Sequence, residues 1–571
     1  MFADDLGRDF YGKIRGQRVL VIVNYDVDAI CACKILQALF KTDYISYTLV
    51  TVDFSNELKT LFDEHHADEK YVIFINCGGT LDVVEEIEPE EDITFFILDS
   101  HRPIDVCNIY NDNQVVLLSK LENPEEVPEF CDIFRDDDSE EDDNDSSEEC
   151  RGGYSDEENE SSESKRRRIC EEAITKRRER KTWEEKRDKL MFEYSQYGYY
   201  GKSSALILFE LAWKLAKDNF DVLWYAILGL SEQYLMNKIT ETTYVTECGD
   251  LQNHVSRLTH DITSRNEGEN LPVHIELEKE HWSIKESLKH SKFSASRLKL
   301  WTFHGEERLH EMLAEIGIPL SQCTQKFNSM DLLFRKEFYS SLVNISEKYG
   351  LNGVVFITFF IRHGYGKKYS AADYVYGLLA LLQSTNGEKT KSHCFMDCLE
   401  ALRQSKKEKL DQGIELGKSL FVSIFKQTQN ALEIKRVQRI GPFLYFCISQ
   451  KFAQTLICSH PYGAILLADF LLTAYATTRK NFNKALASPM VICTPCLGDD
   501  GTLDENDDSI CNIAGIPPIS EESNKNFFGK AFEKAAEHCH IKILNTYFDS
   551  SGEFKKLIKA FFGKLKSALD T

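Results

Sequence analysis

The chain has 571 residues, 42% of them hydrophobic, which is enough for about three to four ordinary domains with sizeable cores. Its net charge of −24 disfavours a broad basic face for duplex DNA, because an acidic chain repels phosphate at long range. The longest apolar run, residues 351–361, is too short to cross a bilayer, and the acidic N-terminus lacks the apolar core of a secretion signal.

Residues 17–119 alternate between short apolar runs and segments of helical periodicity. The apolar runs predict five strands: RVLVIVN, YTLVTVDF, KYVIFIN, ITFFILD and QVVLLS. Helical patterns such as DAICACKILQALF and NELKTLFDEHH lie between them. Near-continuous apolar strands separated by helices predict a parallel sheet that is covered on both faces.

Polar residues follow three of these strands. In a parallel α/β sheet the carboxyl ends of the strands meet at one edge, where ligands bind. Side chains suited to divalent metals therefore gather at that edge: Asp26, Asp28, Asp99 and His101. Two-metal phosphoesterases use such carboxylates and imidazoles to hold paired ions. The alternative is that Asp28 caps the helix starting at Ala29 and that the others are turn residues.

Residues 136–163 are acidic and rich in serine, with a net charge of −14 that leaves only −10 on the rest of the chain. So few apolar residues predict disorder. Three serines have an acid three residues on, the pattern of acidophilic kinase sites: Ser139, Ser146 and Ser155. The segment is either a regulated loop or a solvated spacer.

Residues 165–189 contain twelve bases and six acids, and mixed charge at helical spacing indicates a solvated helix. Two basic clusters separated by seven residues also suit a bipartite nuclear import signal. These clusters are Lys165, Arg166, Arg167, Arg168, and Lys176, Arg177, Arg178.

Two strongly apolar helices are predicted after residue 201. The preceding Gly201-Lys202-Ser203 is a poor phosphate-binding loop, because Gln196 stands where that loop needs glycine and no strand leads in. Residues 296–350 are predicted to be wholly helical. From about residue 385, long helices mix with short strands such as PFLYFCI and PMVICTP, and residues 526–539 form an amphipathic helix.

Several side chains in this second half have both a core and a binding interpretation. Apolar positions of the helical segments are more readily core than interface: Trp301, Phe303, Leu309, Met312, Leu313, Ile316, Phe527, Phe528 and Phe532. Basic residues could line a groove for single-stranded nucleic acid or form a solvated face: Lys367, Lys368, Lys435, Arg436 and Arg439.

Seventeen scattered cysteines, an odd number, predict reduced thiols in a cytosolic or nuclear protein. Cys493 and Cys496 form one CxxC, with His538, Cys539 and His540 further on. Zinc needs four ligands, so this spacing is weak evidence for a metal, and core or surface cysteines are the simpler explanation.

The strand-end motifs resemble those of RecJ-type DHH phosphoesterases: NYDVDA resembles DYDADG, INCGG resembles the DNG motif, and LDSH resembles DHH. The resemblance is closer still to the cell division cycle protein 45 family. It rests on VDAICACKILQALF, SHRPIDVCNIYND, EVPEFCDIFRD, SSALILFELAW, RLHEMLAEIGIPLSQCTQKFNSMD, GPFLYF and NFFGKAFEKAAE, which cover nearly the whole chain.

This resemblance implies an α/β fold with a RecJ/DHH-like parallel sheet. Its expected segments are residues 1–130, the first part of the DHH-like domain; 131–190, a largely disordered acidic then basic insertion; 191–290, the second, helical part; 291–385, a helical helicase-interaction insert; and 386–571, a smaller DHHA1-like α/β domain.

The chain departs from the phosphoesterase pattern at several ligands. Amides, Asn24 and Asn76, stand where the motifs have aspartates, and Ser100 replaces the first histidine of DHH. Ala29 replaces a glycine, and Glu232 is at best the later acid. Fewer charged ligands would hold paired ions poorly, so an inactive site without a cofactor is expected. Asp26, Asp28, Asp99 and His101 could still hold one weak ion.

The family resemblance implies a non-catalytic subunit of the eukaryotic replicative helicase, in the nucleus and monomeric outside the complex. Its implied partners are the MCM hexamer, the GINS complex, the leading-strand polymerase and single-stranded DNA. One alternative is an active Mn²⁺-dependent 5′–3′ single-strand exonuclease. Another is a free-standing single-strand binding protein, for which strong salt-dependent affinity is expected.

Overall fold

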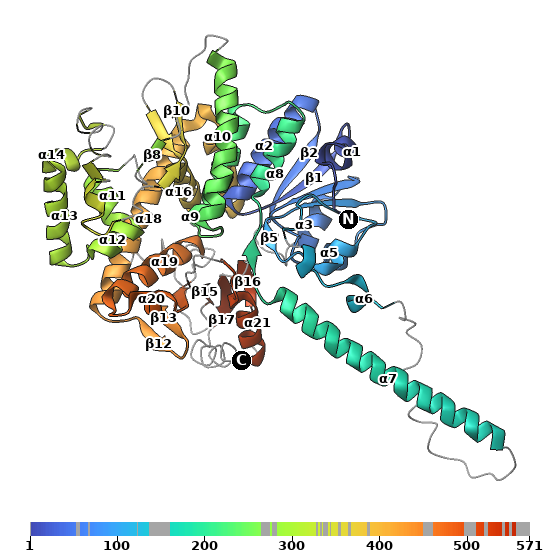
Figure 1. The fold of residues 1–571 in the computed structure, drawn as a ribbon. Helices are drawn as coiled ribbons and strands as arrows, with labels where there is room; N and C mark the ends of the chain where they lie inside the picture. The colour runs from blue at the N-terminus through green and yellow to red at the C-terminus, as the bar shows by residue number, and fades with distance from the viewer. Residues whose placement is uncertain are drawn as a thin grey trace. The chain divides into compact units, whose positions relative to one another are not determined.

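The structure is a computed structural model, and it describes most of the chain (Figure 1). The described residues are 2–52, 58–66, 69–122, 124–135, 160–263, 274–276, 282–326, 329–331, 334, 338, 341–342, 344–351, 356–363, 367–384, 389–448, 461–495, 510–518, 524–539, 543–547 and 551–555. They fall into two compact units, residues 1–120 with 197–571, and residues 121–196.

The first sheet of the larger unit contains the five strands predicted from residues 17–119. Its order is β2-β1-β3-β4-β6 and every neighbouring pair is parallel. The strands are β1 (Val19–Asn24), β2 (Tyr47–Val52), β3 (Tyr71–Ile75), β4 (Thr94–Leu98) and β6 (Val115–Leu117). The predicted α/β class with a parallel sheet is confirmed.

Helices cover both faces of this sheet, as the apolar strands require. One face packs against α2 (Val27–Asp43), α8 (Ser204–Lys214) and α9 (Phe220–Leu235); the other carries α3 (Leu58–His65), α4 (Val83–Ile87) and α5 (Val106–Tyr110) (Figure 1). Since α2 lies between the sheet and two helices, it is buried nearly all round. Each fully buried leucine or phenylalanine there contributes about 1.5–3 kcal/mol.

Further elements complete this part of the unit. They are η1 (Leu6–Tyr11), α1 (Gly12–Ile14), β5 (His101–Arg102), β7 (Tyr199–Tyr200), α10 (Glu241–Thr263) and β8 (His274–Glu276). The antiparallel pair β5–β7 brings the chain after Asp99 beside the segment that leads into α8. This pairing later positions one side of the candidate site.

The segment predicted to be a helical insert, 291–385, is only partly helical. Helix α11 (Ile284–His290) precedes it, and α12 (Lys292–Leu298), α13 (Phe303–Ile316) and α14 (Leu320–Cys323) come first within it. Three short strands follow: β9 (Phe356–Thr358), β10 (Phe360–His363) and β11 (Lys367–Ser370). The run FITFFI is β-branched and aromatic, which favours strand over helix. Helix α16 (Ala371–Leu382) then packs on α9 and α2, in the first core.

A second, six-stranded sheet lies in the C-terminal part, with order β12-β13-β14-β15-β17-β16. Its strands are β12 (Gln438–Ile440), β13 (Phe443–Cys447), β14 (Met490–Pro495), β15 (Ile510–Ile516), β16 (Ile543–Tyr547) and β17 (Ser551–Lys555). The accompanying helices are α17 (Lys391–Ala401), η5 (Gln404–Lys406), α18 (Lys407–Glu433), α19 (Pro461–Thr478), α20 (Phe482–Leu486) and α21 (Phe528–Cys539). Only the β13–β14 pair is parallel among the described pairs.

The smaller unit, residues 121–196, contains η3 (Pro124–Glu126), α6 (Phe130–Ile133) and the 36-residue helix α7 (Glu160–Ser195). The solvated helix predicted for 165–189 is therefore observed, although the expected disorder covered most of 131–190. Mixed charges at helical spacing, such as the Arg180–Glu184 ion pair, stabilise such a helix. The acidic run 136–159, with Ser139, Ser146 and Ser155, lies outside the described residues.

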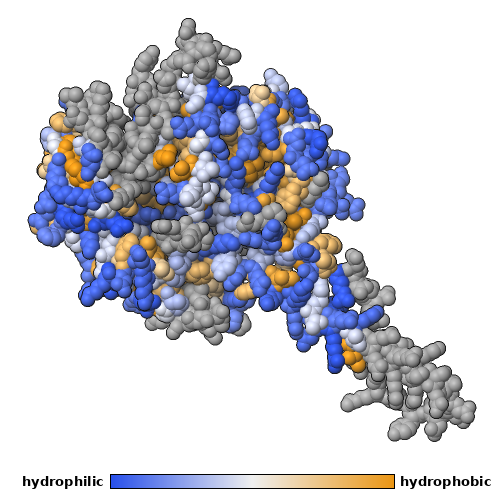
Figure 2. Space-filling model, in the orientation of Figure 1, coloured by the Kyte–Doolittle hydropathy of each residue, from blue (hydrophilic) through white to orange (hydrophobic). Residues whose placement is uncertain are grey.

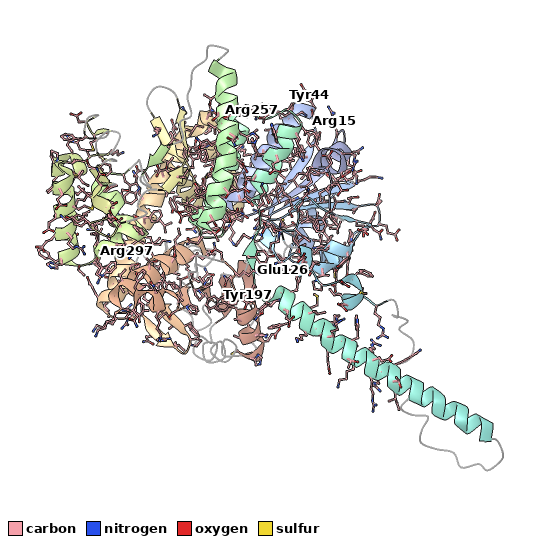
Figure 3. The ribbon with its side chains drawn as sticks, viewed as in Figure 1. Arg15, Tyr44, Glu126, Tyr197, Arg257 and Arg297 are labelled. Carbon is pink, nitrogen blue, oxygen red and sulfur yellow. The ribbon has the colours of Figure 1, made fainter. Side chains whose placement is uncertain are left out.

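Hydrophilic side chains cover most of the described surface in Figure 2, and the apolar patches are scattered among them. Two aromatic residues are largely exposed to solvent: Tyr44 is 92% exposed and Phe303 is 78% exposed. Tyr44, at the C-terminal end of α2, projects from the molecule in Figure 3. In the part of the chain that the structure describes, no helix combines the length and apolarity that a bilayer span requires.

Candidate functional site

The site begins where β1 ends and α2 starts. Asp26 is the N-cap of α2, and its Oδ1 accepts a 2.6 Å hydrogen bond from the backbone N–H of Ala29. This corrects the interpretation in which Asp28 caps the helix. An N-cap side chain reaches an amide two or three residues on, and only Asp26 is placed for that. Asp28 lies in the first turn, buried against the start of α8.

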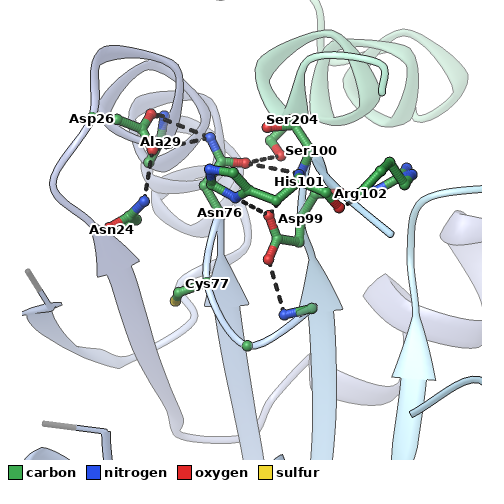
Figure 4. A network of polar contacts seen from close by, with 12 residues as sticks. Asn24, Asp26, Ala29, Asn76, Cys77, Asp99, Ser100, His101, Arg102 and Ser204 are labelled. Carbon is green, nitrogen blue, oxygen red and sulfur yellow. Dashed lines mark hydrogen bonds and ion pairs between the residues drawn. The ribbon is translucent and has the colours of Figure 1, made fainter. Parts of the chain in front are cut away.

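Asn76 joins the two carboxylates. It follows β3 with a φ of +52°, a left-handed conformation that asparagine tolerates better than most residues. Its Nδ2 lies 3.2 and 3.3 Å from the two oxygens of Asp26 and 3.1 Å from Oδ2 of Asp28. Asn24 Nδ2 also donates to Oδ2 of Asp26, at 3.0 Å (Figure 4). Amide N–H groups thus face both carboxylates.

The N-terminal end of α8 supplies the remaining partners of Asp28. Ser203 Oγ donates to Oδ1 of Asp28 at 2.5 Å, and the backbone N–H groups of Ser204 and Ala205 donate at 3.0 and 3.1 Å. Ser204 Oγ donates in turn to Oδ1 of Asn76 at 2.5 Å. The carboxylate therefore lies at the positive end of the α8 dipole, which stabilises its charge.

A glycine on α9 makes room for this arrangement. A Cβ at Gly229 would lie 2.5 Å from Oδ1 of Asp28 and 2.7 Å from the Cβ of Ala205. Both distances are shorter than carbon atoms tolerate without displacement of a neighbour. Helices α8 and α9 can therefore approach Asp28 only because residue 229 has no side chain.

Asp99 and His101 form a separate pair after β4. Asp99 accepts hydrogen bonds from the backbone N–H groups of Gly79, at 2.9 Å, and His101, at 3.0 Å, and lies 2.6 Å from His101 Nδ1 (Figure 4). Burial alone would raise the pKa of Asp99, but the charge and hydrogen bonds of His101 outweigh it and lower that pKa. The Ser100 backbone N–H donates to Oδ1 of Asn76 at 3.3 Å, which links the pair to the rest of the site.

A buried ion pair lies near Asp26. Lys238 Nζ is 2.8 Å from Oε1 of Glu232, and it also lies over the ring of Tyr200, 4.8 Å from its centroid. Burial raises the pKa of Glu232 to about 7, with Lys238 opposing that rise. Burial would lower the pKa of Lys238, but Glu232, Tyr200 and Asp26 raise it far above the ordinary lysine value. Burial also raises the pKa of Asp26, while the positive charge of Lys238 opposes the change.

The structure thus brings the predicted residues together at one sheet edge, but divides them into two groups. Asp26 and Asp28 share Asn76, whereas Asp99 is bonded to His101 and to Gly79. Across the described ranges, no three histidine, cysteine or acidic side chains gather as a metal ion would need.

Sequence reasoning missed three members of the site. Ser203 and Ser204 stand at the start of an apolar helix, the usual position of a capping serine, and this signal could have found them. Lys238 follows the end of α9 with no motif around it, so no pattern in the sequence predicts its burial beside Glu232.

Other predicted side chains lie away from this edge. Lys202 forms ion pairs with Glu210 and Glu247, at 2.7 and 3.5 Å. Phe303 is exposed, which argues against the core interpretation for that residue. The core interpretation is supported for the buried residues of the helical segments: Trp301, Leu309, Met312, Leu313, Phe528 and Phe532. Three basic candidates are exposed around β12: Lys435, Arg436 and Arg439. Cys496 and His540 lie outside the described residues.

Comparison with known proteins bears on the identity of this chain. Residues 19–556 match the family model described as CDC45. The human cell division control protein 45 homolog is 39% identical over 564 residues, which covers 96% of each chain. The chain belongs to the CDC45 family. This CDC45-family membership, expected from the sequence motifs, makes the chain a DNA replication factor.

A solved structure from the same family agrees with the fold. The crystal structure of CDC45 from Entamoeba histolytica matches with a TM-score of 0.69 and 22% identity, over 100% of both chains. A Mn²⁺ complex of RecJ from Thermus thermophilus matches at a TM-score of 0.40 and 11% identity, over 98% of this chain and 53% of that one.

Proposed function

We propose that this CDC45-family chain is a non-catalytic subunit of the replicative helicase, acting with the MCM hexamer and the GINS complex. The proposal that the subunit is non-catalytic rests on the hydrogen bonding of Asp26 and Asp28. Each of their four carboxylate oxygens accepts two hydrogen bonds from the protein. The residues that would bind metal in a two-ion site are already fully engaged.

These contacts fit a paired-metal site poorly. A divalent ion binds through oxygen lone pairs that point at it, and it repels the positive ends of N–H and O–H groups. Here Asn76 directs Nδ2 at both carboxylates, where such an ion would have to lie. Releasing the carboxylates would leave buried donors unsatisfied, at about 1–3 kcal/mol each.

The Lys238 ammonium supplies positive charge beside the buried carboxylates. Asp26, Asp28 and Glu232 are all buried, and buried carboxylates without a cation are costly. Lys238 bonds Glu232 and its charge opposes the rise in the pKa of Asp26. The edge is therefore held together by the chain's own amides, hydroxyls and one lysine, and it serves as a scaffold.

The helicase contacts are assigned to the segment predicted as the insert, residues 291–385. Phe303, in the first turn of α13, is 78% exposed, while Met312 and Leu313 of the same helix are buried. An exposed aromatic side chain on an anchored helix suits a protein partner. The exposed Lys176, Arg177 and Arg178 on α7 remain the candidates for nuclear import. The exposed Lys435, Arg436 and Arg439 remain candidates for contact with single-stranded DNA.

The first test separates this proposal from the exonuclease alternative. Purified protein is incubated with Mn²⁺ and 5′-labelled single-stranded DNA. We expect no release of the 5′ label from the DNA. Digestion that disappears in the Asp26→Ala, Asp99→Ala double variant would contradict the proposal.

The second test addresses the assembly. The chain is mixed with purified MCM hexamer and GINS, and the mixture is separated by gradient sedimentation and assayed for duplex unwinding. We expect co-migration and stimulated unwinding, with both reduced in Phe303→Ala. Ile434→Ala, which removes another exposed apolar side chain outside the insert, is the matched control. Separate migration of the chain would overturn the helicase role.

A further inference from the structure

Two cysteines lie side by side in the C-terminal sheet. Cys447 ends β13 and Cys493 lies in β14, and the two strands are parallel with these residues directly paired. Neighbouring strands are about 4.8 Å apart, inside the Cα separation of about 4.4–6.8 Å that a disulfide spans. Both residues are thiols in this structure.

The two thiols point to the same face of the sheet. Phe443, Val491 and Cys493 belong to the cluster that packs under α21, with Cys447 at its margin. Alternate residues of the same strands, such as Leu444 and Ile492, belong to a different core on the other face. Cys493 is buried whereas Cys447 is half-buried, so a small reagent can approach the pair from the Cys447 side.

The surroundings of Cys447 favour its thiolate. A hydrogen bond from Cys493 lowers the pKa of the Cys447 thiol, against the effect of burial. The Tyr445 side chain, two residues back on the same strand face, and the positive charge of Arg436 lower it further. Reactive cysteines lie in such electropositive, partly exposed places.

We propose that Cys447 and Cys493 form a peroxide-reactive thiol pair. The Cys447 thiolate attacks one oxygen of hydrogen peroxide, and the O–O bond breaks to release hydroxide and leave a sulfenic acid on Cys447. The Cys493 sulfur then attacks that sulfur, expelling the hydroxyl oxygen as water as the thiol proton is lost. Both sulfurs are oxidised and the peroxide is reduced, so that two thiols and one hydrogen peroxide give one disulfide and two waters.

A second close pair of cysteines in the described part of the chain lacks these features. Cys394 and Cys398 lie one turn apart on α17 and are both buried. Burial raises the pKa of both thiols, which suppresses their reactivity. This pair is therefore a matched internal control.

The reduced full-length chain is treated with hydrogen peroxide, quenched with an alkylating agent, digested and examined by mass spectrometry. We expect a Cys447–Cys493 crosslinked peptide lighter by two hydrogen atoms than the reduced pair. Cys447→Ser should abolish it, and Cys398→Ser should leave its yield unchanged. In the untreated chain, iodoacetamide at neutral pH should label Cys447 on the order of ten times faster than Cys398.

Two results would overturn the inference. One is oxidation of other cysteines while this pair stays reduced. The other is a disulfide from Cys493 to Cys496, the partner in the CxxC, in place of Cys447. Circular dichroism of Cys447→Ser checks whether the variant is folded, and Cys447→Ala repeats the test without a hydroxyl. Neither result bears on assembly with the helicase, which the sedimentation test measures separately.

Discussion

The two sheets of the larger unit hold polar and reactive side chains in different ways. At the carboxyl edge of the first sheet, buried carboxylates depend on donors from β1, β3 and α8 at once. In the second sheet, Cys447 and Cys493 are paired on two adjacent strands, and they are positioned by that pairing and by the cluster packed around them. A strand-end site is therefore a network in which loss of one member leaves several others unsatisfied, whereas replacement of one thiol within the second sheet leaves few buried groups without a partner.

The largest effect is expected from Asp28→Ala. It leaves Ser203 and two backbone N–H groups without this acceptor and removes one of the acceptors of Asn76, so unfolding should become easier by about 3–5 kcal/mol. Denaturant unfolding measures this. The control Asp82→Ala, which removes the half-exposed cap of α4, should cost about 1 kcal/mol. Equal losses in both variants would show that the edge is no network.

The next effect is a pH dependence from Glu232. Burial raises its pKa from 4.5 to about 7, so the folded chain binds this proton more tightly than the unfolded chain does. The stabilisation from this group is complete below about pH 4.5 and is lost as pH rises through 7. It amounts to about 3 kcal/mol. Comparison of unfolding free energies for the natural chain and Glu232→Gln between pH 4.5 and 8 should reveal this change. If the unfolding free energies of the two chains change with pH in parallel, the assigned role of Glu232 is wrong.

Asn76→Asp restores the acid of the phosphoesterase motif. It should show whether the Asn76 amide is what prevents a metal ion from binding at this edge of the sheet. A third buried carboxylate beside Asp26 and Asp28 should destabilise the fold by about 2 kcal/mol at neutral pH. Adding Mn²⁺ should raise the melting temperature of the variant and leave that of the natural chain unchanged. A Mn²⁺-dependent rise in the natural chain would count against the scaffold interpretation.

The smallest effect is expected in the second sheet. Cys447→Ser replaces a half-buried thiol by a hydroxyl of similar shape, with an expected loss of about 0.5 kcal/mol or less in thermal unfolding. A loss as large as that of Asp28→Ala would mean that the two sheets do not differ in the way described.

Much of the first domain could be predicted from the sequence because its strands are continuous apolar runs. The pattern of Val19–Asn24 and Tyr71–Ile75 specifies buried parallel strands, and their polar ends specify the edge. The choice of cap between Asp26 and Asp28 depends on where α2 begins, and helix boundaries are the least certain part of a sequence pattern.

Two kinds of contact could not be predicted. One is local, because the turn after α9 brings Lys238 to Glu232, and the other joins distant segments, because Ser204 meets Asn76 across 128 positions of the sequence. The Cys447–Cys493 pairing depends on strand register, which one residue of slip would alter. The strands β9–β11 were missed because an apolar run of that length has no distinct period, so helix and strand compete.

Helix α18 has a mechanical consequence for the whole larger unit. Its first half, with Leu410 and Ile414, is buried in the same cluster as the first sheet, and its second half, with Ile424 and Phe425, is buried beside the second. Gly413 lets it lie against Gly377 of α16, where a Cβ would come 2.7 Å from a carbonyl oxygen. One rigid rod thus belongs to both lobes. A force or a bound partner that tilts one lobe would turn the other with it, and heat should melt the two in a single transition.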